Sequence, residues 1–292
     1  MRAIAFSLDL TGPDTIAARH GIRYPAQDPM LAYREALHRF ADLCAYCGGV
    51  GTLFAPTQDV LGVAAQRLRE LARQGLEVAS HSHEHDDRLA SRSPEQILGD
   101  LTTSRKVLKD EVGIDVAGFR APGYRMNKTL LEKIREAGFS YDSSVVPSPW
   151  FQLSQAGRSA GGNPLTGLGP TVPYRVDRTP FRAGNSDFVE LPLAVTPKVR
   201  LPVNSGALLQ ASAAGRRKLV DGLSQLETVV LSIQAIDLMD LAAGDVTDQL
   251  LQHEPALRGS GRERLEKLGA VMKELGAARE IRTCQQLAEL AR

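Results

Sequence analysis

The sequence predicts an α/β fold, a distorted (β/α) barrel of seven strands, and three observations favour this fold. Short runs rich in β-branched and apolar residues alternate with segments whose apolar residues recur at helical spacing. The chain has 292 residues and is 43% hydrophobic, which is enough to bury a large core. Polar residues suited to catalysis follow several of the expected strands, as they do at the C-terminal face of α/β barrels.

The expected elements follow one another along nearly the whole chain. Strands are expected at 2–9, 51–56, 77–81, 118–122, 141–144, 188–195 and 229–233. Helices are expected at 31–47, 60–74, 94–111, 128–137 and 214–227, with a last one at about 261–275. Gly75 and Gly138 lie just beyond two of these helices and suit their C-terminal ends.

A Gly-, Pro- and Ser-rich stretch at about 145–187 shows little periodicity. One interpretation is a linker between two domains. We favour a long loop over one rim of a single barrel, because another strand pattern and a further β/α unit follow it. The sequence therefore predicts one domain over residues 1–292, without internal repeats.

Charge and hydropathy exclude several classes of partner. Lysine and arginine number 35 against 34 acidic residues, so the formal net charge of +1 favours neither nucleic acid nor an anionic membrane. The first apolar stretch is too short for a signal-peptide core, and no apolar run has the roughly 18 residues of a spanning helix. We therefore expect a cytoplasmic protein with a neutral or weakly charged ligand.

The three cysteines favour a structural role. Cys44 and Cys47 form a C-x-x-C pair, which is also found in redox proteins and zinc sites, but no second pair exists and Cys284 is distant. The spacing suits one face of a helix. We expect two small side chains packed at the end of the helix at 31–47, reduced and without metal.

Polar side chains are expected to converge at one end of the barrel. Asp9, His81, Arg120, Asp142 and Gln234 each lie at the end of an expected strand. Asp142 and Gln234 are therefore counted with Asp9 and Arg120 as catalytic candidates. Packing alone does not account for such a set.

The histidine-rich run after the third strand is the sharpest of these signals. His81 and His85 are four residues apart at a strand-to-helix turn, so both could direct ring nitrogens at one metal, whereas His83 would point elsewhere. The alternative is that the run, with Asp86 and Asp87, is a solvated loop.

Five segments resemble the polysaccharide deacetylase family, carbohydrate esterase family 4, whose fold is the NodB-homology barrel. They are FSLD at 6–9, ASHSHEH at 79–85, GFRAPGY at 118–124, AGFSYDSSVVP at 137–147 and VELPLAVTP at 189–197. The resemblance implies that Asp9 is the general base, that Arg120 orients it, and that His81 and His85 are zinc ligands. It also implies a metal-dependent hydrolase that removes an acyl group from an N-acylated sugar or related amide, so that its partner would be a carbohydrate or other N-acylated small molecule.

Two positions depart from the family's pattern. Thr11 stands where a carboxylate should complete the metal site, and a neutral hydroxyl is a poor zinc ligand. Gln234, in LSIQAID at 231–237, replaces the histidine that should protonate the leaving nitrogen, and an amide does not titrate. Zinc or another divalent metal is therefore expected to bind weakly, unless Asp14, Asp86 or Asp87 substitutes as a ligand.

Two functional hypotheses follow from the same residues. The first is a deacetylase-like hydrolase of reduced activity, and the second is a pseudo-deacetylase that uses its site to bind a glycan or a protein partner. Tyr124 and Trp150 are expected to contact the substrate, with Phe151 and Tyr174 as further stacking surfaces. The alternative for these aromatic side chains is that they anchor the 145–187 loop.

Overall fold

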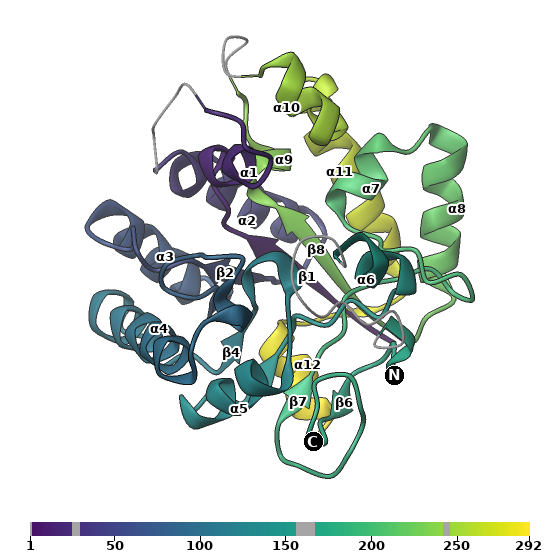
Figure 1. The fold of residues 1–292 in the computed structure, drawn as a ribbon. Helices are drawn as coiled ribbons and strands as arrows, with labels where there is room; N and C mark the ends of the chain where they lie inside the picture. The colour runs from purple at the N-terminus through teal and green to yellow at the C-terminus, as the bar shows by residue number, and fades with distance from the viewer. Residues whose placement is uncertain (1, 25–29, 156–166, 242–245) are drawn as a thin grey trace.

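The computed structural model describes residues 2–24, 30–155, 167–241 and 246–292, and it has a mixed α/β fold with a curled sheet surrounded by helices (Figure 1). All seven expected strands are present, which confirms the predicted fold class. They are β1 (Ala3–Asp9), β2 (Thr52–Ala55), β3 (Glu77–Ser80), β4 (Gly118–Phe119), β5 (Tyr141–Asp142), β7 (Val189–Glu190) and β8 (Thr228–Gln234). These strands are parallel and lie in the order β7-β5-β4-β3-β2-β1-β8.

Two short strands complete the sheet at its margins. The strand β6 (Tyr174–Arg175) runs antiparallel to β7, and β9 (Glu280–Ile281) pairs with the beginning of β1. The sheet forms a half-barrel, and its two ends approach each other where Ala194 donates its backbone N–H to the carbonyl of Val230 at 3.0 Å. This contact brings the segment after β7 alongside β8.

The strand β1 illustrates why the fold forms from this sequence. Every residue of Ala3–Asp9 is buried, as expected for a parallel strand covered on both faces. Helices shield the outside of the sheet, and their apolar residues join one large core with β1, β2 and β8. The carboxyl ends of the strands are thereby held at one end of a closely packed scaffold.

The six expected helices are all observed, two of them with a wider turn at one end. They are the π-helical turn Ala32–Ala36 with α2 (Leu37–Tyr46), α3 (Val63–Arg73), α4 (Pro94–Val107) with the π-helical turn Leu108–Val112, α5 (Lys128–Glu136), α8 (Ala213–Ser224) and α11 (Gly261–Ala277). Ser93 and Gln96 form a capping box at the start of α4. Gly113 ends this helix with φ at 81°, a conformation that glycine adopts readily.

The sequence prediction missed the short strands β6 and β9 and also a set of short helices. These helices are α1 (Pro13–Arg19), α6 (Pro149–Gln155), α7 (Ser205–Gln210), α9 (Ala235–Leu238), α10 (Asp248–His253), α12 (Cys284–Leu290) and the 3₁₀ turns Leu89–Ser91, Pro122–Tyr124 and Pro255–Arg258. Each is too short to show helical periodicity in a window of 11 residues or more.

Two expectations about these regions were wrong. The helix at 261–275 is not the last one, because α12 follows it, and the capping box of Thr283 and Gln286 was a readable signal for that helix. The 145–187 stretch is not loop throughout, because it contains α6 and β6, although 156–166 lie outside the described residues. The single-domain organisation stays a prediction. No helix within the described ranges is long and apolar enough to cross a membrane.

The cysteines lie where the helical interpretation expects them. Cys44 is buried on α2, Cys47 follows the end of this helix and is half-buried, and Cys284 is buried at the start of α12. All three are free thiols.

Candidate active site

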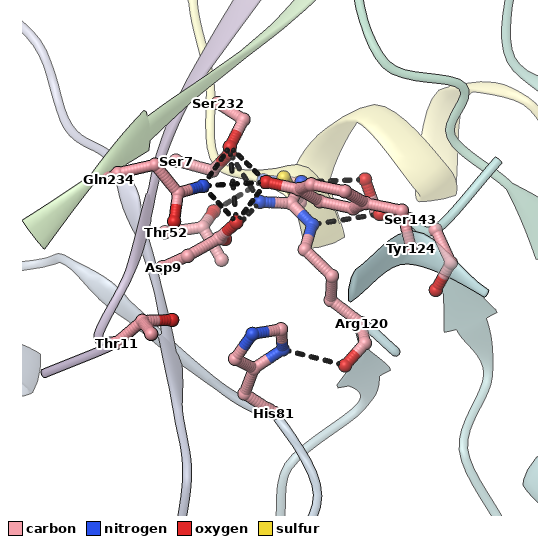
Figure 2. Close-up of polar contacts among 12 residues, drawn as sticks. Ser7, Asp9, Thr11, Thr52, His81, Arg120, Tyr124, Ser143, Ser232 and Gln234 are labelled. Carbon is pink, nitrogen blue, oxygen red and sulfur yellow. Dashed lines mark hydrogen bonds and ion pairs between the residues drawn. The ribbon is translucent and has the colours of Figure 1, made fainter. Parts of the chain in front are cut away.

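The strand ends bring four of the predicted catalytic and metal-site residues into one cluster (Figure 2). Asp9 ends β1 and Gln234 ends β8, and these two residues face each other in the register of the paired strands. His81 directly follows β3, and Arg120 directly follows β4. The cluster therefore lies at the carboxyl edge of the sheet, where α/β barrels place their functional groups.

Asp9 and Arg120 form an ion pair that is removed from water. Arg120 Nη1 lies 2.6 Å from Asp9 Oδ1, and the side chains are 0% and 1% exposed. The same guanidinium donates to Ser7 Oγ and to Ser143 O and Oγ, each at 2.8 Å, and lies over the ring of Phe54. A buried ion pair is favourable only when its remaining donors and acceptors are also satisfied, and here Arg120 meets that condition.

The second carboxylate oxygen of Asp9 accepts three more hydrogen bonds. Gln234 Nε2 donates to Oδ2 at 2.9 Å, Ser232 Oγ donates at 3.1 Å, and the hydroxyl of Tyr124 also donates to it. Burial alone raises the pKa of Asp9, but the charge of Arg120 and the hydrogen bond from Tyr124 help to hold that pKa below its ordinary value. Asp9 is therefore an ionised carboxylate with both oxygens engaged.

The rings of His81 and His85 lie side by side. Their ring centroids are 4.7 Å apart and their planes are inclined by 51°. His81 Nδ1 is 2.8 Å from the backbone carbonyl of Arg120, and His85 Nε2 is 3.2 Å from Thr11 Oγ1. The contact with the carbonyl requires a proton on Nδ1, which leaves Nε2 of His81 as the nitrogen with a free lone pair.

Burial keeps both imidazoles neutral. It lowers the pKa of His81 to about 4, and together with the neighbouring His81 it lowers the pKa of His85 well below its ordinary value. A neutral imidazole is the form that binds a metal ion.

The turn that carries the histidines is held in an uncommon backbone conformation. Ser82 has φ at 69° and His85 has φ at 54°, in the left-handed region that residues with a side chain seldom adopt. Ser82 Oγ accepts the backbone N–H of His85 at 3.0 Å. Asp100 on α4 accepts the N–H groups of His83 and Glu84, both at 2.9 Å. These bonds offset the cost of the turn and fix the direction of His85.

Sequence analysis did not identify several residues that build the site. Asp100 supports the histidine turn, and its signal was a carboxylate on the apolar side of a helix, between Ile97 and Leu101. Ser7 and Ser232 lie two residues before Asp9 and Gln234, so the alternation of side chains along a strand turns them to the same face as those residues. Both were readable from that spacing.

The donor set fits a divalent metal only in part. His81 and His85 supply two imidazoles, but Thr11 brings no carboxylate, and the described residues contain no group of three or more His, Cys, Asp or Glu that could hold a metal ion. Two of the three proposed substitutes are engaged elsewhere, because Asp86 pairs with Arg92 at 2.7 Å and Asp87 pairs with Arg19 at 2.8 Å. Asp14 is not part of any such pair or of a metal-ligand group within the described residues. Zinc sites take at least three protein ligands, so this set favours weak binding.

Other predicted residues lie apart from the cluster or beside it. Asp142 accepts hydrogen bonds from Ser144 and shares one with Glu190, and no contact with Asp9 joins it to the described site. His83 turns away from His81, as expected, and its Nδ1 is 2.9 Å from Thr57 Oγ1.

The aromatic side chains mostly act as anchors. The indole N–H of Trp150 donates to the carbonyl of Val199 at 2.9 Å, and the ring is 54% exposed. The buried hydroxyl of Tyr174 donates to Pro180 O. Phe151 packs edge-on against Tyr124, with ring centroids 6.3 Å apart. Tyr124 alone among them reaches the catalytic cluster in the described structure.

Comparison with known proteins supports the assignment that the motifs suggested. Residues 34–141 match the family model described as polysaccharide deacetylase. A bifunctional xylanase/deacetylase from Pseudobutyrivibrio xylanivorans is 29% identical over 83 residues, which are 28% of this chain and 14% of that protein. The matched region thus spans a small part of the relative's length.

Solved structures of the same fold include carbohydrate esterase family 4 proteins. A polysaccharide deacetylase from Mycobacterium smegmatis has a TM-score of 0.59 at 18% identity, with 99% of this chain and 90% of that one covered. A family 4 acetyl xylan esterase from Clostridium thermocellum, in complex with cobalt, has a TM-score of 0.50 at 15% identity and coverages of 99% and 91%. A mutant family 4 pseudoenzyme with restored activity has a TM-score of 0.50 at 10% identity, covering 98% and 67%.

Residues 34–141 thus match the polysaccharide deacetylase family model, and the fold is one that carbohydrate esterase family 4 proteins share.

Proposed function

We propose that this chain is a deacetylase-like hydrolase that removes an acyl group from the nitrogen of an N-acylated sugar or related amide. The observation that carries the proposal is the buried ion pair of Asp9 and Arg120 beside His81. A buried ion pair is often no more stabilising than well-packed apolar residues of similar volume. Its retention is therefore best explained by catalysis or ligand binding.

Each residue of the cluster has a role in this proposal. Asp9 would accept the proton of the attacking water, and Arg120 keeps that carboxylate oriented and ionised. His81 and His85 are the residues that would hold a divalent metal, with the hydroxyl of Thr11 next to His85. Such a metal, when bound, polarises the acyl carbonyl. Because Gln234 cannot titrate, the departing nitrogen would take its proton from the solvent or from the substrate.

A second candidate, a pseudo-deacetylase that binds its ligand without hydrolysing it, is favoured by one specific observation. The Oδ2 atom of Asp9 is covered by donors from Tyr124, Ser232 and Gln234, so this oxygen has little capacity left for a water proton. One structure of similar fold belongs to a pseudoenzyme whose mutant has restored activity. The restored activity is a property of that protein, but the pair shows that a protein of this fold can be folded and yet inactive.

The two candidates can be separated by measuring acetate released from N-acetylated sugar oligomers, with and without added zinc or cobalt. Metal-dependent release that Asp9→Asn abolishes supports the hydrolase. Arg73→Gln, at an exposed position on α3, is the matched control and should leave the rate unchanged. Saturable binding of the oligomers without release supports the pseudo-deacetylase. Neither binding nor release would overturn both proposals.

A further inference from the structure

A polar cavity of about 410 Å³ opens beside His85. Three segments that are distant in the sequence meet there: the second half of α1, the turn that begins at His85, and the residue after the 3₁₀ turn Pro122–Tyr124. The lining residues are Thr15, Ala18, Arg19, His85, Asp86, Asp87, Arg88 and Arg125. Since His85 also contacts Thr11, the cavity adjoins the catalytic cluster without being part of it.

The carboxylates of this cavity are already neutralised. Asp87 accepts from Arg19 Nε at 3.1 Å and from Nη2 at 2.8 Å. Asp86 accepts from Arg92 Nε at 2.9 Å and lies 2.7 Å from its Nη2. The cationic side chains of Arg88 and Arg125 complete the lining. The lining therefore carries three arginines against two carboxylates, which gives the cavity a net positive charge.

Arg88 and Arg125 point to a ligand, because within the described residues neither guanidinium forms an ion pair with a carboxylate; Arg125 is also partly buried. Its Nε is buried, and this N–H has no hydrogen-bond partner within the described parts of the chain. A buried N–H without a partner is costly, more so on a charged group, and native structures contain few of them. This N–H is closed to solvent, so an anion in the cavity would meet the other N–H groups of the guanidinium, whose planar fork suits the paired oxygens of a phosphate or carboxylate.

We propose that this cavity is an anion subsite, which takes a phosphate or carboxylate carried by the acylated substrate whose amide lies at the cluster of Asp9 and His81. The substrate class is then an anionic N-acylated sugar or amide. The identity of the reacting group rests on the proposed function, whereas the anion site rests on Arg88 and Arg125 alone. Phosphate and carboxylate share the chemistry that this site requires.

Binding, measured by calorimetry at fixed ionic strength, tests the proposal without needing turnover. The probes are N-acetylglucosamine, N-acetylglucosamine 6-phosphate and N-acetylmuramic acid, with inorganic phosphate alone as a fourth. We expect at least one anionic sugar to bind about 10-fold or more tightly than the neutral one, since a hydrogen bond to a charged group contributes that much. The tighter of the two anionic sugars identifies the anion.

The variant Arg125→Gln should remove most of this preference and leave the affinity for N-acetylglucosamine unchanged. Arg88→Gln, at an exposed position, should reduce the preference and provides a second variant in case the first folds poorly. Arg73→Gln, which removes an exposed arginine elsewhere, should have no effect.

Two results would overturn the subsite. The first is equal affinity for neutral and anionic sugars together with no binding of inorganic phosphate. The second is a preference for anions that survives both Arg125→Gln and Arg88→Gln. Absence of acetate release with the anion preference intact would count against the hydrolase and in favour of the subsite.

Discussion

Gln234 lies directly opposite Asp9 in the paired strands β1 and β8, and its side-chain N–H donates to Asp9 Oδ2 at 2.9 Å. An amide keeps both of its protons at every physiological pH. The contact therefore places a hydrogen-bond donor that does not titrate on one oxygen of the proposed base. A histidine at position 234 would release that oxygen whenever its ring nitrogen was deprotonated.

The double variant Thr11→Asp with Gln234→His should hydrolyse N-acetylated oligomers about 100-fold faster than the natural protein, and it should bind zinc more tightly. The added carboxylate would lie next to His85, whose Nε2 is 3.2 Å from Thr11 Oγ1. Acetate release and zinc titration measure the two effects. Gln234→His alone should give little, because metal and acid act on the same transition state.

Adding Asp9→Asn to this double variant is the control, and it should remove the gain in rate. A double variant that binds zinc tightly but releases no acyl group from a broad panel of acylated amines would contradict the hydrolase.

Breaking the buried ion pair should destabilise the fold. Asp9→Asn leaves the charge of Arg120 buried without its counterion, so the free energy of unfolding should fall by about 3 to 5 kcal/mol. Ser7→Ala is the comparison, because it removes one neutral partner of the same guanidinium and should cost about 1 kcal/mol. Urea unfolding followed by circular dichroism measures both. Equal losses of unfolding free energy in the two variants would show that the charge of Asp9 contributes no more to stability than a neutral hydrogen-bond partner of Arg120.

Asp237 should make stability depend on pH. Burial raises its pKa from 3.8 to about 6 in the folded protein, where Ser205 Oγ donates to its carboxyl at 2.5 Å. The neutral form is favoured on folding, so this contribution is fully present below about pH 4 and is lost as pH rises towards 6. The loss amounts to about 3 kcal/mol by linkage.

Asp237→Asn should therefore stabilise the protein more at pH 7 than at pH 4, measured as the difference between the two proteins in urea unfolding. The comparison at each pH cancels the titration of the other groups. A variant whose stability differs from that of the natural protein by the same amount at both pH values would exclude this role for Asp237.

The three thiols should differ in their reaction with iodoacetamide. Burial raises the pKa of Cys44, Cys47 and Cys284, and the thiolate is the reactive form. At pH 8 we expect slow labelling of half-buried Cys47 and protection of the other two until urea unfolds the chain. Mass spectrometry of the labelled peptides measures this order. A disulfide in protein purified without oxidant would contradict the structural role of the pair.

The strands were predictable because burial on both faces leaves a continuous apolar run, as in β1 and β8. The order of polar strand ends also predicted which residues lie at the same edge of the sheet. It could not predict hydrogen-bond partners, since these depend on rotamers and on neighbours distant in the sequence. Asp142 illustrates the limit, because its side chain bonds to Ser144 and Glu190 instead of turning to Asp9.

The guanidinium of Arg120 reaches from the end of β4 to Ser7 and Asp9 on β1 and to Ser143 beyond β5. It therefore fastens together three strands that are not all neighbours in the sheet. A site held by these hydrogen bonds is preorganised, so little free energy of binding is lost in ordering its side chains when a ligand binds. The choice of ligand should consequently depend on the segments around the site, such as the arginine-lined cavity beside His85. These segments can change in evolution while the cluster of Asp9 and Arg120 stays the same.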